Sequence, residues 1–244
     1  MDRSDFVFGI RPIMEAIDSG KEIDKLFVQK DAQGELLHEL TKLAKARNIV
    51  PQRVPVEKLN RITRKNHQGA IATISPVEFS DLQEVVTRVY EDSKQPFVLL
   101  LDGVTDVRNF GAICRTAEAA GVNAIVIPQR GAASINGDAV KTSAGALFKI
   151  PVCKVSSISA AITDLQAFGI KVLGASEKVS QLPYEIDLKE PIALVMGNEE
   201  KGLQDDVVRS CDYLVQIPMQ GEIGSLNVSV AAGVLLFEIV RQRI

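Results

Sequence analysis

The residues best suited to chemistry lie where an apolar segment passes into the last helical pattern of the chain. This stretch, residues 217–231, reads IPMQGEIGSLNVSVA and gathers Gly221, Gly224, Ser225 and Asn227 just before the helix. The first turn of a helix carries backbone N–H groups without intrahelical partners, and glycine lets a backbone approach a ligand closely. The stretch therefore predicts a site where the backbone wraps around a small polar ligand.

Two more loops, residues 102–109 and 197–202, are rich in Gly, Asn and charged residues. The second has the G-x-x-x-x-G spacing of a phosphate-binding loop, but Leu203 and Gln204 stand where that loop needs Lys and Ser or Thr. No G-x-G-x-x-G turn follows the first strand of this part of the chain. Because the loop is acidic, it disfavours a polyphosphate and suits a ligand with hydroxyls, an amine or a positive sulfonium.

Other catalytic patterns are missing from the sequence. There is no G-x-S-x-G elbow, and with two histidines, His38 and His67, neither a Ser/His/Asp triad nor a His/Cys zinc site is expected. We therefore expect no metal.

These loops require strands to position them. Largely apolar runs predict strands at 97–101, 124–127, 171–174, 192–196 and 213–217, alternating with helices at 109–120, 157–168, 203–210 and 226–241. Such runs suit strands buried on both faces of a parallel sheet. We expect an α/β domain whose ligand lies beyond the carboxyl ends of the strands.

The first 75 residues predict a smaller α/β module. Helical patterns at 9–17, 35–46 and 56–62 alternate with extended runs at 25–28, 49–54 and 69–74. An amphipathic stretch and a polar segment follow, so residues 76–96 are expected as a linker between domains at 1–75 and 97–244.

Composition and charge narrow the class of protein. The chain has 244 residues, a formal net charge of −3 and three scattered cysteines, with neither a long apolar run nor a signal-peptide pattern, which predicts a cytoplasmic protein. Residues 42–65 nevertheless hold eight basic side chains against one acid. Such a cluster is suited to a phosphate backbone, although a solvated helix face explains it equally well.

Three segments together resemble the SpoU-type (TrmH-like) RNA ribose methyltransferases of the knotted SPOUT class. They are residues 101–117 (LDGVTDVRNFGAICRTA), 193–203 (ALVMGNEEKGL) and the stretch 217–231. Segments 8–12 (FGIRP) and 66–69 (NHQG) resemble the substrate-binding domain of the large-subunit (23S) ribosomal RNA guanosine 2′-O-methyltransferases. Val107 departs from the family, which often has Pro there.

The resemblance implies a small L30e-like α/β domain followed by a parallel-sheet α/β domain with a trefoil knot. It implies a homodimer that transfers a methyl group from S-adenosylmethionine to a ribose 2′-hydroxyl, with RNA as partner and large-subunit ribosomal RNA as the first expectation. The catalytic positions that match are Asn109, Arg115, Glu199, Ser225 and Asn227. Those that would line the cofactor are Met196, Gly197, Gly202, Ile217 and Leu226.

Structural explanations exist for each catalytic position. Asn109, Ser225 and Asn227 could cap helices, Arg115 could form a surface ion pair, and Glu199 could be a solvated loop acid. A guanidinium stays charged at neutral pH, so we expect Arg115 to grip a phosphate or stabilise an oxyanion more readily than to act as a base.

Other functions remain open from the sequence. Transfer RNA could be the substrate of the same reaction, the fold could serve a non-catalytic RNA-binding or ribosome-assembly factor, or the chain could be a small-molecule α/β enzyme.

Overall fold

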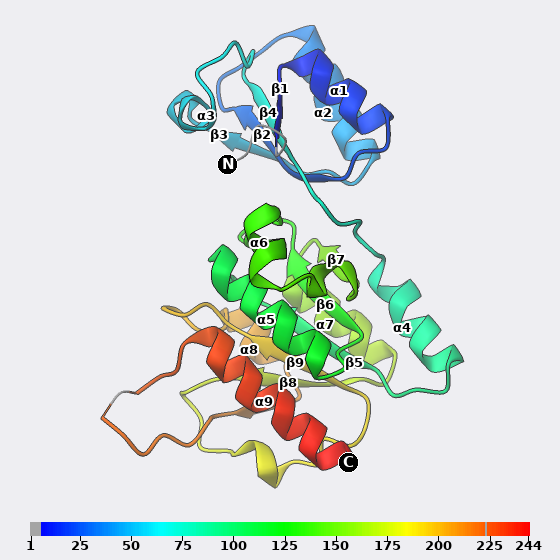
Figure 1. Cartoon of the computed structure of the whole chain (residues 1–244), viewed down its shortest axis with the longest axis vertical. Helices are drawn as coiled ribbons and strands as arrows, with labels where there is room; N and C mark the ends of the chain where they lie inside the picture. Colours follow the sequence, from blue (N-terminus) through cyan, green and yellow to red (C-terminus); the bar gives the residue numbers. More distant parts are fainter. Residues whose placement is uncertain (1–5, 223) are drawn as a thin grey trace. The chain divides into compact units, whose positions relative to one another are not determined.

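The chain folds as two compact units (Figure 1). One consists of residues up to Glu78 with Ser134–Gly137, and the other of Phe79–Ala133 and Asp138–Ile244. The computed structural model describes residues 6–222 and 224–244. Ile223 of the glycine-rich stretch and residues 1–5 of the expected first domain lie outside the described residues.

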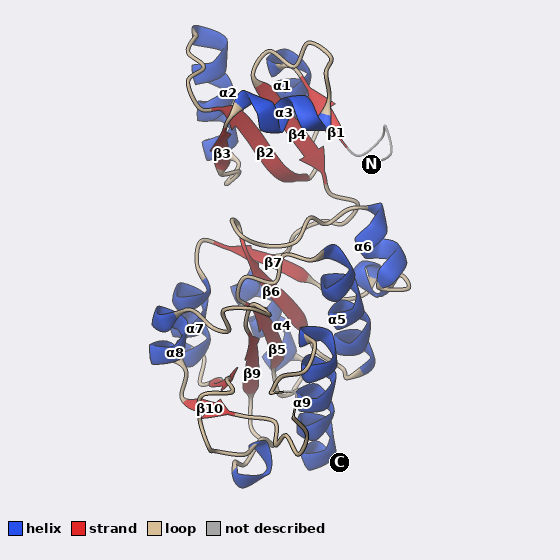
Figure 2. Ribbon diagram, turned by 90° about the vertical axis from the view of Figure 1, so that its left-hand side faces the viewer, coloured by secondary structure: helices blue, strands red, loops and turns tan. Residues whose placement is uncertain are grey.

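The first unit is a four-stranded sheet covered by helices on both faces (Figure 2). Its strands lie in the order β1 (Phe6–Phe8), β4 (Ala70–Ile74), β2 (Ile23–Gln29) and β3 (Pro51–Val54), and only β2 and β3 run parallel. Side chains alternate along β2, so Leu26 and Val28 pack in one core and Phe27 in the other. Helices α1 (Ile10–Asp18) and α2 (Glu35–Ala46) complete the first core, and α3 (Val56–Ile62) completes the second.

The second unit is built on a six-stranded parallel sheet. The order is β10 (Tyr213–Val215), β8 (Lys171–Ala175), β9 (Ile192–Met196), β5 (Phe97–Leu101), β6 (Ala124–Pro128) and β7 (Val152–Val155). The predicted α/β fold with a parallel sheet is confirmed. The trefoil knot stays a prediction.

Helices cover the sheet of the second unit. Helices α4 (Leu82–Glu91), α7 (Ile158–Ala167) and α8 (Asp205–Ser210) share a core with alternate strand residues such as Val98, Leu100 and Val195. Helices α5 (Val107–Ala119) and α9 (Val228–Arg243) pack against each other, and the short helices α6 (Gly137–Thr142), η1 (Ala146–Phe148) and η2 (Pro183–Glu185) lie in connections. In the described part of the chain, no helix combines the length and apolar character needed to cross a membrane.

The structure differs from the sequence expectations in several elements. The expected linker 76–96 contains α4, whose Leu82, Val85 and Val86 are buried in the core of the second unit. Strands β1 and β7 were not expected, because β1 has three residues and β7 includes Lys154 among its four. Helix α5 begins two residues earlier than expected, and α9 begins at Val228 rather than at 226.

Candidate active site

The two central strands bring two of the expected loops side by side. Strands β5 and β9 are parallel neighbours, Leu101 pairs with Met196, and the N–H of Asp102 donates to the carbonyl of Met196 at 2.8 Å. The chain runs from β5 to β6 and β7 on one side of this pair, while β8 and β10 lie on the other side. The strand order therefore reverses between β5 and β9. Open parallel sheets bind ligands at such a point, and the loops 102–106 and 197–203 lie there.

The loop after β9 is a closed turn. The N–H of Asn198 donates to the carbonyl of Gly202 at 3.0 Å, and the N–H of Gly202 donates back at 2.9 Å. The side chain of Asn198 donates to the carbonyl of Gly103 at 2.8 Å, which joins the two loops. A Cβ atom on Gly197 would lie 2.4 Å from the carbonyl carbon of Gly202, so no side chain fits at Gly197.

A buried carboxylate fixes the end of this turn. Asp102 is 1% exposed, and its Oδ2 accepts the backbone N–H of Gln204 at 2.8 Å, while its Oδ1 accepts the Gln204 side-chain amide. Gln204 is the residue before α8. The carboxylate at the end of β5 therefore holds the residues that follow the 197–202 turn.

Three of the five expected catalytic residues form one hydrogen-bonded cluster. The amide of Asn109 donates to Glu199 Oε1 at 2.7 Å, and the amide of Asn227 donates to the same oxygen at 2.8 Å and to Asn109 Oδ1 at 3.1 Å. These residues come from the first turn of α5, the turn after β9, and the residue before α9.

The structure shows whether Asn109 and Asn227 cap a helix or belong to the hydrogen-bonded cluster. Asp106, not Asn109, caps α5, because its Oδ1 accepts the N–H groups of Arg108 and Asn109. Asn227 does both, since its Oδ1 accepts the N–H of Ser229 at 3.0 Å while its amide joins the cluster. Both amides donate to Glu199 Oε1. The other carboxylate oxygen, Oε2, accepts no hydrogen bond from the described residues.

The other two expected catalytic residues do not join the cluster. Ser225 lies on the wall of the cavity described next and forms no hydrogen bond with another described residue. Arg115 is exposed and has no polar partner among the described residues, which excludes a surface ion pair within this part of the chain. It follows Asn109 by six helical positions, so the two side chains leave α5 about 120° apart.

A cavity of about 690 Å³ lies next to the cluster. All five residues expected to line the cofactor are on its wall: Met196, Gly197, Gly202, Ile217 and Leu226. Glu199 is on the same wall and belongs to the cluster. Sequence reasoning missed the wall formed by 175–180, which follows β8 and has no signal beyond its place after a strand.

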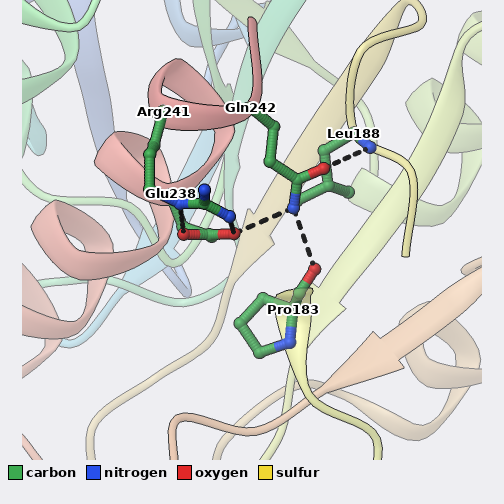
Figure 3. A network of polar contacts seen from close by, with 5 residues as sticks. All are labelled: Pro183, Leu188, Glu238, Arg241 and Gln242. Carbon is green, nitrogen blue, oxygen red and sulfur yellow. Dashed lines mark hydrogen bonds and ion pairs between the residues drawn. The ribbon is translucent and has the colours of Figure 1, made fainter. Parts of the chain in front are cut away.

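The last turns of α9 hold residues Pro183 and Leu188 through a network of polar contacts (Figure 3). Gln242 accepts the N–H of Leu188 at 3.0 Å and donates to the carbonyl of Pro183 at 3.3 Å and to Glu238 at 2.8 Å. Arg241 donates two hydrogen bonds of 2.8 Å to Glu238 and thereby lowers the pKa of that carboxyl. Pro183 follows Leu182, which lines the cavity. Helix α9 therefore begins directly after the cluster residue Asn227 and, near its end, contacts a residue next to the cavity wall.

The donor set fits an organic ligand. Within the described ranges, no group of three or more His, Cys, Asp or Glu side chains is placed to hold a metal ion. The cavity falls in the range of about 300–1,000 Å³ that small-molecule sites occupy. Ile217 and Leu226 supply apolar surface, Gly197 exposes backbone, and Glu199 supplies negative charge.

Comparisons with known proteins cover both units. The model of the SpoU rRNA methylase family matches residues 96–237, and a model described as RNA 2′-O ribose methyltransferase substrate binding matches residues 6–80. A Bacillus subtilis protein named as a TrmH family tRNA/rRNA methyltransferase, YacO, is 35% identical over 98% of this chain and 96% of its own length.

Solved structures give the same result. The SpoU methyltransferase AviRb from Streptomyces viridochromogenes, in complex with AdoMet, matches with a TM-score of 0.61 and 27% identity over 98% of this chain and 90% of that chain. An AdoMet-bound rRNA methyltransferase from Sinorhizobium meliloti matches with a TM-score of 0.62 and 27% identity over 99% of this chain and 88% of that chain. Both neighbours are thus similar in fold along nearly the whole of this chain.

Proposed function

The chain belongs to the SpoU rRNA methylase family, and from this premise we propose that it methylates the ribose 2′-hydroxyl of a guanosine in large-subunit (23S) ribosomal RNA. The protein is an RNA methyltransferase, and its cofactor is S-adenosylmethionine. The 2′-hydroxyl and the ribosomal guanosine are the proposed parts. We also propose that the reaction takes place in the cytoplasm.

One observation carries the proposal: Glu199 belongs both to the wall of the cofactor cavity and to the Asn109–Glu199–Asn227 cluster. A methyl donor in the cavity and an acceptor hydroxyl at the cluster would therefore meet at one carboxylate. When bound, the cofactor supplies an electrophilic methyl group on a positively charged sulfur. Met196, Gly197, Gly202, Ile217 and Leu226 hold it, and Ser225 faces it from the same wall.

The cluster orients the acceptor and receives its proton in this proposal. A ribose hydroxyl is a weak acid, so a positioned group must accept its proton as the oxygen attacks. Two amides hold Glu199 Oε1, which leaves Oε2 for the hydroxyl or for a water that relays the proton. Arg115 grips a phosphate or stabilises the oxygen as negative charge develops on it.

In this proposal Arg115 acts at the cluster of a second copy of the chain, not at the cluster of its own chain. It has no partner in its own described chain, while α9 exposes Val230, Val234 and Phe237, which are 52%, 43% and 48% exposed. Their spacing puts them on one face of α9, and Leu235, Leu236 and Ile239 face the core. We propose a homodimer in which this apolar stripe meets a second copy and Arg115 serves the second copy's cluster. A protein that is monomeric by light scattering and fully active in the methyl-transfer assay would contradict it.

Residues 1–75 bind the substrate RNA in this proposal and residues 97–244 catalyse the transfer. The segment 76–96 connects them, and its helix α4 packs in the core of the second unit. The eight basic side chains of 42–65 are all exposed, but they do not form a single patch. Lys42 and Lys45 lie on α2, while Lys58 and Arg61 lie on α3, across the sheet. Lys58 stands 4.8 Å from the ring centre of Phe27. The α3 side also carries Lys65, which lies 5.8 Å from the ring centre of Phe8.

The test is transfer of labelled methyl from S-adenosylmethionine to total RNA from cells that lack this protein, followed by mapping of the new 2′-O-methyl. One new methyl in large-subunit ribosomal RNA is the expected result. The names of the relatives include tRNA as well as rRNA, so a methyl found only on transfer RNA would replace the ribosomal assignment. Cofactor binding without transfer to any RNA would favour a non-catalytic RNA-binding factor.

A further inference from the structure

A second cavity, of about 620 Å³, lies at the start of α5 and belongs to none of the functions above. It is lined by Thr105, Asp106, Val107 and Arg108 from the end of the β5–α5 loop and the first turn of α5, and by Asp138, Lys141 and Thr142 from α6. Arg108 and Lys141 are exposed, and their side chains form no hydrogen bond or ion pair with the rest of the described chain. Two cations from different elements therefore border one cavity without partners.

Close packing holds the two elements together. A Cβ atom on Gly111 would lie 2.7 Å from Thr142 Cβ and 2.9 Å from the carbonyl oxygen of Ala139, so α5 and α6 touch with no room for a side chain. Arg108 comes one turn before Gly111, and Lys141 directly precedes Thr142. The contact at Gly111 therefore fixes the positions from which both cations leave their helices.

Each of the two carboxylates of the cavity lies at the N-terminal end of a helix, where the helix dipole is positive. Asp106 accepts the N–H groups of Arg108 and Asn109 and so sits at the positive end of α5. Asp138 lies in the first turn of α6. The hydroxyl of Thr142 donates to the carbonyl of Asp138 at 2.8 Å. The charges of Arg108 and Lys141 are left for a ligand. Because none of the described residues that line the cavity is aromatic, that ligand is bound by charge rather than by base stacking.

We propose that this cavity holds the phosphate of the RNA strand next to the target ribose, with Arg108 and Lys141 as positioning residues. The inference rests on the proposed function. Asn109 follows Arg108 directly, about 3.8 Å along the backbone, and belongs to the cluster with Glu199. Neighbouring side chains leave a helix about 100° apart, so Arg108 and Asn109 serve adjacent faces of the first turn of α5. Because phosphate and ribose are bonded neighbours in a nucleotide, a phosphate at Arg108 and a ribose at Asn109 would belong to one strand that crosses these two faces. A forked guanidinium and an ammonium are the groups that bind phosphate oxygens in proteins.

The test compares Arg108→Gln and Lys141→Gln with matched controls that remove the same charges elsewhere. Arg209→Gln on α8 and Lys189→Gln before β9 change exposed residues that lie outside the cavity and form no ion pair with the described chain. The substrate is the RNA that the wild-type enzyme methylates. Each cavity variant is expected to raise KM for RNA about tenfold with kcat within about twofold. The slope of log affinity against log salt should fall by about 1, because one phosphate contact is lost.

Two further readouts separate positioning from damage to the fold. Cofactor affinity should be unchanged in both cavity variants, and Arg108→Lys should restore the salt slope because it keeps the charge. An unchanged KM and an unchanged salt slope in both cavity variants would overturn the inference, and so would an equal rise in KM in the controls. In either case, methyl transfer by the wild-type protein would leave the proposed function standing. If the wild-type protein transfers methyl to no RNA, the proposed function fails and the inference fails with it.

Discussion

The buried contact between Asp102 and Gln204 predicts an unusual pattern of mutational effects. The carboxylate of Asp102 accepts two N–H groups from Gln204, one from the backbone and one from the side chain. Asp102→Asn should cost little, because the Gln204 amide can turn over and accept the new N–H. Gln204→Glu should cost far more, because a second carboxylate then faces a carboxylate that is 1% exposed.

The size of the effect follows from the hydrogen bond that is lost. A hydrogen bond to a charged group contributes about 1.5–3 kcal/mol, and the introduced carboxylate relieves the added repulsion by swinging into water. We therefore expect Gln204→Glu to lower the free energy of unfolding by about 2 kcal/mol. Combining it with Asp102→Asn should recover most of this loss, because the introduced amide can donate to the introduced carboxylate, which gives a coupling energy of about 2 kcal/mol.

The assay is a double-mutant cycle by urea unfolding, with calorimetry for S-adenosylmethionine. Because Gln204 follows the 197–203 wall of the cavity, the single Gln204→Glu variant should also weaken cofactor binding, by up to about 30-fold if the whole cost falls on the bound loop. Gln95→Glu adds the same charge at an exposed position and should change neither quantity. A Gln204→Glu protein as stable as wild type, or a double variant no better than the single one, would refute the reasoning.

Two substitutions and the behaviour of two thiols test the site and the core. Gly197→Ala should weaken cofactor binding at least about tenfold by calorimetry, because its Cβ would lie 2.4 Å from backbone that closes the 197–202 turn; an unchanged Kd would contradict the close approach. Arg115→Lys keeps the charge but loses the forked geometry, so methyl transfer should fall by most of its rate in the labelled assay, and near-normal turnover would rule out that role. Burial raises the pKa of the Cys153 and Cys211 thiols from 9.0 to about 12, so both should react slowly with a thiol reagent at about pH 8. Because the unfolded thiols ionise first, the stability that this burial contributes is complete below about pH 9 and falls as pH rises toward about 12, as unfolding measured against pH would show.

Local patterns in the sequence were sufficient for the elements that lie deepest in the fold. Strands Phe97–Leu101 and Ile192–Met196 have the bounds that their apolar runs predict, because a strand buried on both faces needs an uninterrupted run. Shorter or half-buried strands were not predicted, since Val152–Val155 carries Lys154 and has no such run. The residues expected to line the cofactor came from family motifs, not from periodicity.

The arrangement of the site came from the tertiary structure alone. Asn109 and Glu199 are 90 residues apart in sequence, and Asn227 is 28 residues further on, yet their side chains share one carboxylate oxygen. Asn109 and Glu199 meet because β9 pairs with β5 as well as with β8, the strand before it in sequence. The pairing with β5 is a non-local choice that no window of sequence contains.

The amino-acid sequence by itself therefore determined the family, the cofactor and the residue types at the site. Only the tertiary structure decided which of those residues touch: Asn109, Glu199 and Asn227 do, whereas Arg115 leaves another face of α5 without a partner in its own described chain. The physical reason is that residue type sets which bonds a side chain can form, while packing of distant elements sets which partner comes within reach.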